Sequence, residues 1–327
     1  MNTQSNKPRS WAMRVLLVVL CLKLLGWMLI WRRYQHDTRV HRRRIAAGRL
    51  EVQTPCGVIE YGEVGAGTPV LVIHGSGGGY DQGLLMGARL GEGFRVIAPS
   101  RFSYLNAPLP DDASVVAQAD AYACLLDALK IDCVVVMGLS AGGPSVLQFA
   151  LRYPERVSGL VLACAISNVR PVRDVHETAQ AALLRDFPYW LLVNLAPGVA
   201  LGFLGLSQES QRHMTAEERE YALRVLRDMM PLGMRATGIA YDSLEDNLFR
   251  GAEFDLARIT APALVVHATD DTFVPFRHAQ YSAAHIPGAR LLSMDRGGHF
   301  VAALNEASMQ IGAFIIESTT RVSLGSS

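Results

Sequence analysis

Residues 134–143 read VVVMGLSAGG and decide the fold of this chain. An apolar, β-branched run leads directly into the pattern Gly-x-Ser-x-Gly, and helix-forming residues follow. This pattern is typical of a sharp strand-to-helix turn that holds a serine hydroxyl at an exposed and strained apex. Gly138 and Gly142 suit such a turn because its backbone packs too closely to accept a Cβ atom. The pattern predicts Ser140 as a nucleophile, provided that a base and an acid lie elsewhere in the chain.

The composition limits the class of protein. The chain has 327 residues, of which half are apolar and 19% are charged, and its net charge is +1. This length allows one large domain with an insertion, and the near-neutral charge argues against nucleic acid as a partner. The five cysteines show no C-x-x-C pair and no metal-ligand spacing. We therefore expect neither a metal site nor a disulfide framework, and interpret the cysteines as small buried apolar side chains.

Residues 15–31 are apolar except for Lys23 and Gly26, and the stretch from Trp11 to Trp31 is long enough to cross a bilayer as a helix. Trp11 opens it, and Trp27 and Trp31 lie in its last turns, where interfacial aromatic residues gather. Lys23 lies inside the stretch and would have to extend toward a headgroup region. A cleaved signal peptide is disfavoured because no small-x-small site follows the apolar core. The sequence predicts a single-pass membrane anchor, with a soluble amphipathic helix as the alternative.

The charges that flank this stretch predict its orientation. Three basic residues, Lys7, Arg9 and Arg14, lie at its amino-terminal end, and seven arginines follow it: Arg32, Arg33, Arg39, Arg42, Arg43, Arg44 and Arg49. This excess favours a cytoplasmic position for the carboxy-terminal side. Residues 32–49 are interpreted as a basic linker that either is solvated or rests on anionic headgroups.

From residue 50 onward, predicted strands alternate with predicted helices. The apolar runs predict strands at residues 50–54, 58–64, 69–74, 94–98, 133–137, 157–164, 263–267 and 289–294, the first two as an antiparallel hairpin. Helical spacing covers residues 112–129, 276–285 and 301–316 and a stretch that ends near 152. This alternation predicts an α/β fold with a mostly parallel sheet and helices on both faces.

Residues 168–256 interrupt the alternation with helical stretches at 179–195, 197–204 and 216–230. They predict a helical cap inserted into a core of residues 50–167 and 257–317, with an anchor and linker at 1–49 and a flexible tail at 318–327. Residues 187–193, FPYWLLV, are interpreted as core of the cap, with the lining of an acyl pocket or contact with the membrane as alternatives.

A serine nucleophile needs a base and an acid that orients the base. His299 is the predicted base, because it follows two glycines in the loop between the last strand and the last helix. Asp271 and Asp270, after the strand at 263–267, are the candidates for the acid. His267 is interpreted as a packed structural residue, and His278 as part of a surface helix.

An oxyanion hole needs backbone N–H groups. We expect one from Ala141, directly after the nucleophile, and one from the loop HGSGGG at residues 74–79. Ser76 is the preferred donor in that loop, with Gly75 and Gly77 as alternatives. The loop lacks the Lys-Ser/Thr of a phosphate-binding loop and the spacing of a dinucleotide fingerprint, so phosphate binding is not expected.

Residues 50–317 resemble the α/β-hydrolase family through the loop at 74–79, the turn at 138–143, and Asp271 and Pro275 followed by the stretch around His299. The resemblance implies the α/β-hydrolase fold and a triad in the order Ser140, Asp271, His299. It selects Asp271 over Asp270, because the family's acid typically stands four residues before a proline. Relatives that open epoxides or remove halides carry aspartate in place of the serine, so Ser140 argues against both activities.

The predicted function is hydrolysis of a small or medium acyl ester through an acyl-enzyme on Ser140, with no metal or organic cofactor. Transfer of the acyl group to an acceptor other than water stays open. The loop at 74–79 is also similar to that of hydrolases that cleave carbon–carbon bonds in ring-fission products, which is the alternative activity. A non-catalytic binding protein on the same fold is the alternative from another class.

Overall fold

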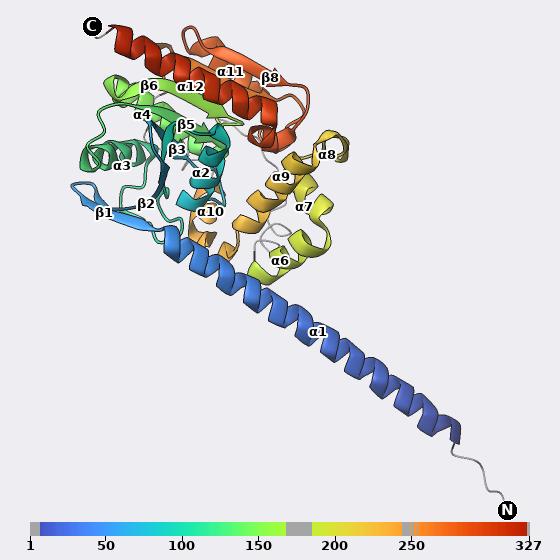
Figure 1. Ribbon diagram of the computed structural model, residues 1–327. Helices are drawn as coiled ribbons and strands as arrows, with labels where there is room; N and C mark the ends of the chain where they lie inside the picture. Colours follow the sequence, from blue (N-terminus) through green and yellow to red (C-terminus); the bar gives the residue numbers. More distant parts are fainter. Residues whose placement is uncertain (1–6, 168–184, 244–248, 250–251, 253, 326–327) are drawn as a thin grey trace, which may run out of the picture. The chain divides into compact units, whose positions relative to one another are not determined.

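The computed structural model describes residues 7–167, 185–243, 249, 252 and 254–325 (Figure 1). Its contacts divide the chain into two compact units, residues 1–44 and residues 45–327. The first part of the helix predicted at 179–195 falls outside the described residues.

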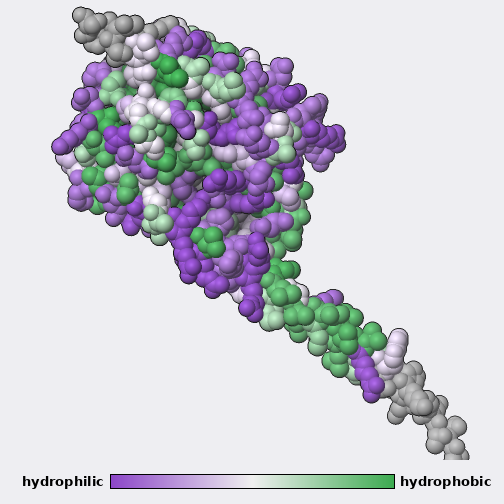
Figure 2. All heavy atoms as spheres, in the orientation of Figure 1, coloured by the Kyte–Doolittle hydropathy of each residue, from purple (hydrophilic) through white to green (hydrophobic). Residues whose placement is uncertain are grey.

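The amino-terminal unit is built by one long helix, α1 (Lys7–Gly48), which continues for 42 residues. Its most apolar window has a mean hydropathy of 2.2, so its length and composition make it a candidate membrane span, although a signal sequence meets the same criteria. Figure 2 shows apolar side chains along this helix. The linker predicted from residue 32 is helical as far as Gly48, because no proline or glycine interrupts residues 32–47.

An eight-stranded sheet forms the centre of the second unit, in the order β1-β2-β4-β3-β5-β6-β7-β8. β1 pairs with β2, and β2 with β4, in antiparallel fashion, and the other neighbours are parallel. This confirms the predicted mostly parallel sheet and its amino-terminal hairpin. The strands are β1 (Leu50–Thr54), β2 (Gly57–Gly65), β3 (Thr68–Ile73), β4 (Phe94–Pro99), β5 (Val134–Leu139), β6 (Val157–Ala163), β7 (Ala263–Ala268) and β8 (Arg290–Met294).

Helices cover both faces of the sheet, as predicted. Alternate residues of β3 point to opposite sides, so Leu71 belongs to one buried cluster and Val72 to the other. The first cluster is covered by α3 (Val115–Ala128), α4 (Gly143–Arg152) and α11 (Arg277–His285), and the second by α2 (Tyr80–Gly87) and α12 (Asn305–Gly325). The flexible tail predicted from residue 318 is helical up to Gly325, since Ser318 is still buried against the sheet.

Five helices lie between β6 and β7 in the described part of the chain, and we refer to residues 186–243 as the helical segment. They are α6 (Asp186–Leu195), α7 (Pro197–Phe203), α8 (Gln208–His213), α9 (Ala216–Asp228) and α10 (Ala236–Ser243). α9 begins with a capping box, in which Thr215 and Glu218 each accept the other's backbone N–H. Short 3₁₀ helices complete the chain: η1 (Ala88–Leu90), η2 (Ser140–Gly142), η3 (Pro154–Arg156), η4 (Leu232–Met234), η5 (Leu256–Arg258) and η6 (Gly298–Ala303).

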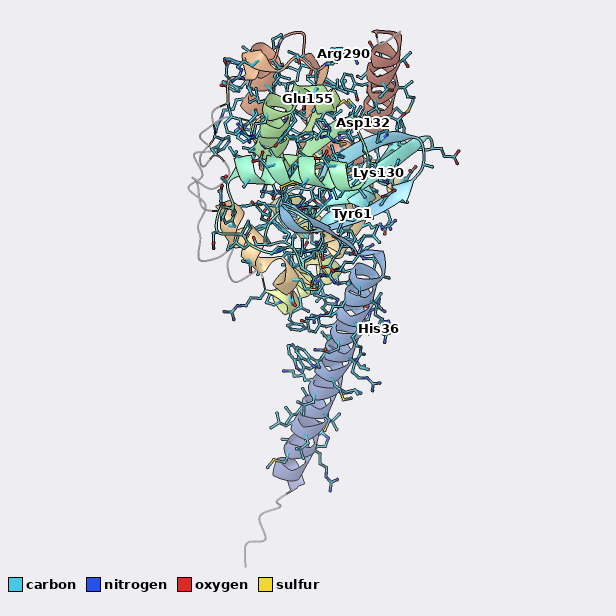
Figure 3. All side chains as sticks on the ribbon, turned by 90° about the vertical axis from the view of Figure 1, so that its left-hand side faces the viewer. His36, Tyr61, Lys130, Asp132, Glu155 and Arg290 are labelled. Atoms are coloured by element: carbon cyan, nitrogen blue, oxygen red, sulfur yellow. A yellow bond between two sulfur atoms is a disulfide. The ribbon has the colours of Figure 1, made fainter. Side chains whose placement is uncertain are left out.

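The two ends of the parallel strands carry different residues. Lys130, Asp132 and Glu155 lie in the turns that lead into β5 and β6, at the amino ends of these strands (Figure 3). The carboxyl ends, where β5 runs into Ser140 and β7 into Asp271, lie at the opposite edge. The candidate site is therefore at the edge where parallel α/β sheets bind their ligands.

The expectation that the cysteines are unpaired, buried side chains is wrong for Cys56 and Cys124, which form a pair, and for Cys21, which is exposed. Cys56 in the β1–β2 turn forms a disulfide with Cys124 of α3, with their Cα atoms 6.2 Å apart. Of the others, Cys164 is buried, Cys133 half-buried and Cys21 exposed. The pairing spans 68 residues and depends on how α3 packs beside the hairpin, which cysteine spacing alone does not reveal.

Candidate active site

Ser140 sits in the sharp turn that the sequence predicts. β5 ends at Leu139, and the backbone of Ser140 has a φ of 49°, a left-handed conformation that is strained for a residue with a side chain. A Cβ atom on Gly142 would lie 2.6 Å from the carbonyl oxygen of His74, and one on Gly138 would lie 2.4 Å from the Val146 side chain. Both glycines are therefore needed for the chain to turn this tightly.

The structure brings Ser140, His299 and Asp271 together in a single hydrogen-bonded chain. Ser140 Oγ lies 2.9 Å from His299 Nε2, and His299 Nδ1 lies 2.9 Å from Asp271 Oδ2. A carboxylate accepts only, so Nδ1 carries the proton and donates to Asp271. Nε2 of the neutral ring is then left to accept the hydroxyl hydrogen of Ser140. This arrangement can draw the proton from the serine oxygen.

Asp271 is held in place by four groups. Its Oδ1 accepts the backbone N–H groups of Phe273 at 2.7 Å and Val274 at 2.9 Å, and its Oδ2 faces both His299 and His267 Nε2, the latter at 3.3 Å. Burial by itself would raise the pKa of Asp271. The attraction of the carboxylate to the imidazolium form of His299, together with the hydrogen bonds from His267, His299 and Val274, outweighs burial and holds this pKa well below its ordinary value.

Asp270 plays a different part in the geometry. Its Oδ1 accepts the backbone N–H of Gly298 at 2.8 Å, and its Oδ2 accepts the hydroxyl of Ser210 from α8. Asp270 thus connects the loop that carries His299 to the helical segment through hydrogen bonds. Asp271, in contrast, contacts the imidazole itself.

The glycine-rich loop at residues 74–79 lies directly beside Ser140, since a Cβ atom on Gly75 would lie 2.9 Å from that of the serine. Gly75 N–H donates to Gln82 at 3.0 Å, and Gly77 N–H donates to the Tyr104 hydroxyl at 3.3 Å. Within the described residues, no hydrogen bond engages the N–H of Ser76. Of the three predicted donors in this loop, two are therefore already used, and Ser76 is left.

His74 is a site residue whose role the sequence did not reveal. It is fully buried, its Nδ1 lies 2.7 Å from the Gly75 carbonyl oxygen, and its Nε2 accepts the backbone N–H of Arg101 at 2.9 Å. Burial, and then the charge of Arg101, hold the pKa of His74 well below its ordinary value. The neutral ring fixes where the loop starts and links it to the end of β4.

The helical segment reaches the site through the turn between α7 and α8. The backbone oxygen of Gly205 accepts the N–H of His299 at 3.4 Å, and the ring of Phe273 packs on the imidazole with 4.8 Å between centroids. The contact between Gly205 and His299 was not predicted, because it joins parts of the chain that lie about ninety residues apart. The two contacts place apolar groups around the imidazole and restrict its motion.

Two other histidines, His267 and His278, are buried. His267 is buried at the end of β7, as expected of a packed structural residue. His278 lies on α11, which has an exposed face as expected of a surface helix, but His278 itself is on the buried face: it is 1% exposed, and its Nδ1 accepts the N–H of Ser167 at 3.3 Å. α11 turns this side toward the core, where Ser167 also donates its hydroxyl to the His278 carbonyl.

No group of three or more metal-ligating side chains occurs among the described residues. A surface depression of about 490 Å³ lies over α3 and α4, and its lining includes none of the residues around Ser140. Its walls are Val116, Gln148, Leu151, Arg152, Tyr153, Asp255 and Arg258.

Comparison with known sequences gives a family match and named relatives. Residues 68–306 match the profile of the alpha/beta hydrolase fold. The uncharacterized hydrolase YcgS of Bacillus subtilis is 28% identical over 257 residues, which cover 75% of this chain and 89% of that protein. A 2-hydroxy-6-oxo-6-phenylhexa-2,4-dienoate hydrolase of Burkholderia cepacia is 26% identical over 275 residues, which cover 74% of this chain and 85% of that protein.

Solved structures with the same fold include an alpha/beta hydrolase fold protein from Nakamurella multipartita. It is 30% identical, with a TM-score of 0.69, and the match covers 83% of this chain and 98% of that one. A membrane phospholipase A described as a bacterial virulence factor is 21% identical, with a TM-score of 0.61. That match covers 95% of this chain and 99% of the phospholipase, and at this identity it indicates a shared fold.

Proposed function

The chain belongs to the α/β-hydrolase family, and we propose that it is a serine hydrolase that cleaves carboxylic esters through an acyl-enzyme on Ser140. The observation that carries this proposal is the hydrogen-bonded chain from Ser140 through His299 to Asp271. An alcohol is a weak nucleophile at neutral pH, and a neutral imidazole at 2.9 Å with its far nitrogen held by a carboxylate is the arrangement that activates it.

In the first half of the proposed reaction, Ser140 Oγ attacks the ester carbonyl while its proton moves to His299 Nε2. The tetrahedral oxyanion collapses, the bond to the alcohol breaks, and His299 returns the proton to the departing alcohol oxygen. In the second half, water attacks the acyl-enzyme, again giving a proton to His299, and the acid and the free serine are released. Asp271 stays ionised throughout and stabilises the imidazolium.

We assign the oxyanion donors to the backbone N–H groups of Ala141 and Ser76. Ala141 directly follows the nucleophile, so its N–H lies at the start of the turn into α4. Ser76 is supported because the neighbouring Gly75 and Gly77 N–H groups already donate to Gln82 and Tyr104. Donors fixed beforehand at the place where charge develops contribute the largest share of many rate enhancements.

The proposal places the enzyme on a membrane through residues 11–31 of α1, the stretch whose length and hydropathy allow it to span a bilayer. Disulfides persist in oxidising compartments, so the bond between Cys56 and Cys124 favours a domain outside the cytoplasm. This is opposite to the side predicted from the arginine excess. Alkylation of free thiols in intact cells tests it, because a cytoplasmic domain would have both cysteines reduced and modified.

A second candidate activity is the hydrolysis of carbon–carbon bonds in ring-fission products. It is supported by the resemblance of the loop at 74–79 and by the relative in Burkholderia cepacia, which is named a hydrolase of 2-hydroxy-6-oxo-6-phenylhexa-2,4-dienoate. Both candidates use the same three side chains, and they differ in the substrate carbonyl that Ser140 or a water molecule attacks.

The test is hydrolysis of p-nitrophenyl esters of increasing acyl length by the full chain in detergent micelles, with Ser140→Ala as the control. We expect turnover with one preferred acyl length, lost in the variant by a factor of about 10⁴ or more. Turnover that survives Ser140→Ala would refute the serine mechanism. Absence of ester turnover, together with cleavage of a vinylogous 1,5-diketone, would replace the ester proposal by carbon–carbon hydrolysis.

A further inference from the structure

Two buried ion pairs join the helical segment to the core on either side of the loop at residues 74–79. Arg235, from the turn before α10, lies 2.7 Å from Asp81 of α2, and their side chains are 1% and 8% exposed. Arg101, which follows β4, holds Asp242 of α10 through two hydrogen bonds of 2.9 and 2.7 Å. The core and the helical segment each supply one cation and one anion. Separating them would leave four charges without their partners in buried positions, which is strongly unfavourable.

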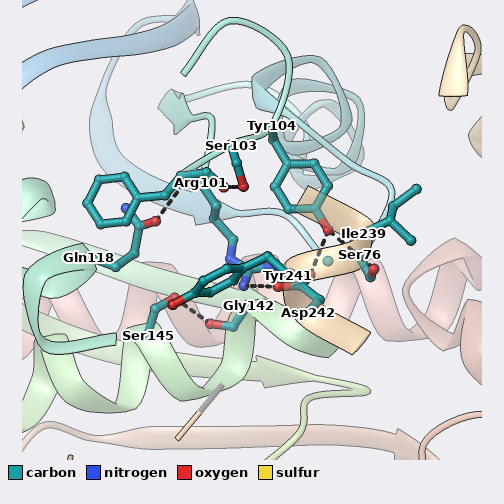
Figure 4. Close-up of polar contacts among 12 residues, drawn as sticks. Ser76, Arg101, Ser103, Tyr104, Gln118, Gly142, Ser145, Ile239, Tyr241 and Asp242 are labelled. Carbon is teal, nitrogen blue, oxygen red and sulfur yellow. Dashed lines mark hydrogen bonds and ion pairs between the residues drawn. The ribbon is translucent and has the colours of Figure 1, made fainter. Parts of the chain in front are cut away.

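Tyr104 connects the second ion pair to the loop (Figure 4). Its hydroxyl donates to Asp242 Oδ2 at 2.6 Å. Because the hydroxyl hydrogen is used there, the oxygen is left to accept the N–H of Gly77 at 3.3 Å and the hydroxyl of Ser76 at 3.2 Å. Burial, and then the charge of Asp242, hold the pKa of Tyr104 well above its ordinary value, so this hydroxyl stays protonated.

Arg235 holds the other end of the same loop. It is fully buried, and its guanidinium donates to the carbonyl oxygen of Gly78 in addition to Asp81. It also donates to the backbone oxygens of Asp228 at 2.9 Å and Met229 at 2.8 Å, at the end of α9. The loop is thus fixed at Ser76–Gly77 by one ion pair and at Gly78 by the other.

We propose that Tyr104, Asp242 and Arg101 are positioning residues, which hold the Ser76 N–H where it meets the oxyanion and make that alignment depend on the docking of α10. The inference rests on the proposed function, because it assigns a use to the oxyanion donor. Ser76 lies between two residues that are both tied by hydrogen bonds, so its N–H direction follows from theirs. A displacement of α10 would remove Asp242 from Tyr104 and release the loop, so acyl transfer proceeds only while α10 is docked.

Tyr104→Phe removes the contact with little other change, because the ring stays packed against His74, at 4.7 Å between centroids. For the full chain in detergent micelles, we expect kcat to fall by about 10-fold to 100-fold while KM changes by less than about threefold. Affinity for an alkylboronic acid, which mimics the tetrahedral intermediate, should fall by a similar factor. Amide hydrogen exchange in residues 75–78 should become faster.

Asp242→Asn is an independent variant that acts through the same hydroxyl, and Asp242→Glu, which keeps the carboxylate, should restore part of the lost kcat. Tyr221→Phe is the matched control. The Tyr221 hydroxyl also joins the helical segment to the core, donating to the Leu85 carbonyl at 2.9 Å, but it does not contact the loop. We expect this control to keep wild-type kcat and wild-type exchange in the loop.

A Tyr104→Phe variant with wild-type kcat and unchanged exchange in residues 75–78 would overturn the positioning role. Equal losses of kcat in Tyr104→Phe and Tyr221→Phe would also overturn it, since they would reveal only general weakening of the contact between the helical segment and the core. A wild-type chain without ester turnover would instead refute the proposed function. The exchange measurement still decides on the positioning contacts in that case, because it needs no substrate.

Discussion

The two adjacent acids give the sharpest test of the site. In Asp271→Asn, the amide oxygen can keep the two backbone hydrogen bonds that Oδ1 now accepts from Phe273 and Val274. The amide nitrogen then faces His299 Nδ1 at about the present 2.9 Å. Two donors cannot share that contact, so the imidazole moves its proton to Nε2 and can no longer accept one from Ser140. We expect kcat to fall by about 10⁴-fold, or about 5 kcal/mol of transition-state stabilisation.

Asp270→Asn is the matched control, because it changes the neighbouring carboxylate in the same way. Its oxygen can still accept the Gly298 N–H, and the imidazole keeps its partner, so we expect a loss of kcat below about 10-fold. The assay is the steady-state hydrolysis of a p-nitrophenyl ester, with circular dichroism to show that both variants fold. An equal or larger loss in Asp270→Asn would refute the assignment of Asp271 as the acid that orients His299.

Three further predictions concern the rest of the domain. Replacing Cys56 and Cys124 by serine should lower the free energy of unfolding in urea by about 4 kcal/mol, the loop-closure value for a separation of 68 residues, with kcat unchanged. Burial lowers the pKa of His278 from 6.5 to about 4. The unfolded chain therefore binds more protons between these values, and stability should fall by about 2 kcal/mol from pH 7 to pH 5. Urea unfolding of His278→Gln should show a smaller loss of stability between pH 7 and pH 5. A loss equal to that of the wild type would refute His278 as its cause. Gly142→Ala should lower the melting temperature and the kcat together, because its Cβ would lie 2.6 Å from a backbone oxygen; a variant with wild-type values of both would contradict the packing argument.

Much of the central fold could be predicted because the sequence signals are local. β3 and β5 are buried on both faces, so their sequences are continuous apolar runs, and their bounds fall within about two residues of the prediction. The turn at Ser140 needs a glycine two residues before and two residues after the serine, and the pattern Gly-x-Ser-x-Gly contains both. The acid and the base follow strand ends, so the topology of the sheet carries them to the serine.

The contacts that hold the site in place could not be predicted from local sequence. Arg101 and Asp242 are 141 residues apart, and Arg235 and Asp81 are 154 apart, and nothing in either local sequence marks a partner. The burial of His278 depends on which side of α11 meets Ser167, and a nine-residue helix has too weak a periodicity to decide it. Long-range pairing is fixed by packing, which the order of residues does not display.

The central claim is that Ser140 becomes acylated through the hydrogen-bonded chain to His299 and Asp271. The most direct measurement is the release of p-nitrophenol by the full chain in the first turnover, combined with mass spectrometry of the quenched protein. We predict a burst of about one equivalent of p-nitrophenol per chain and an acyl group on the peptide that contains Ser140. Turnover without an acyl group on that peptide would contradict the claim. An acyl group on another residue would also contradict it.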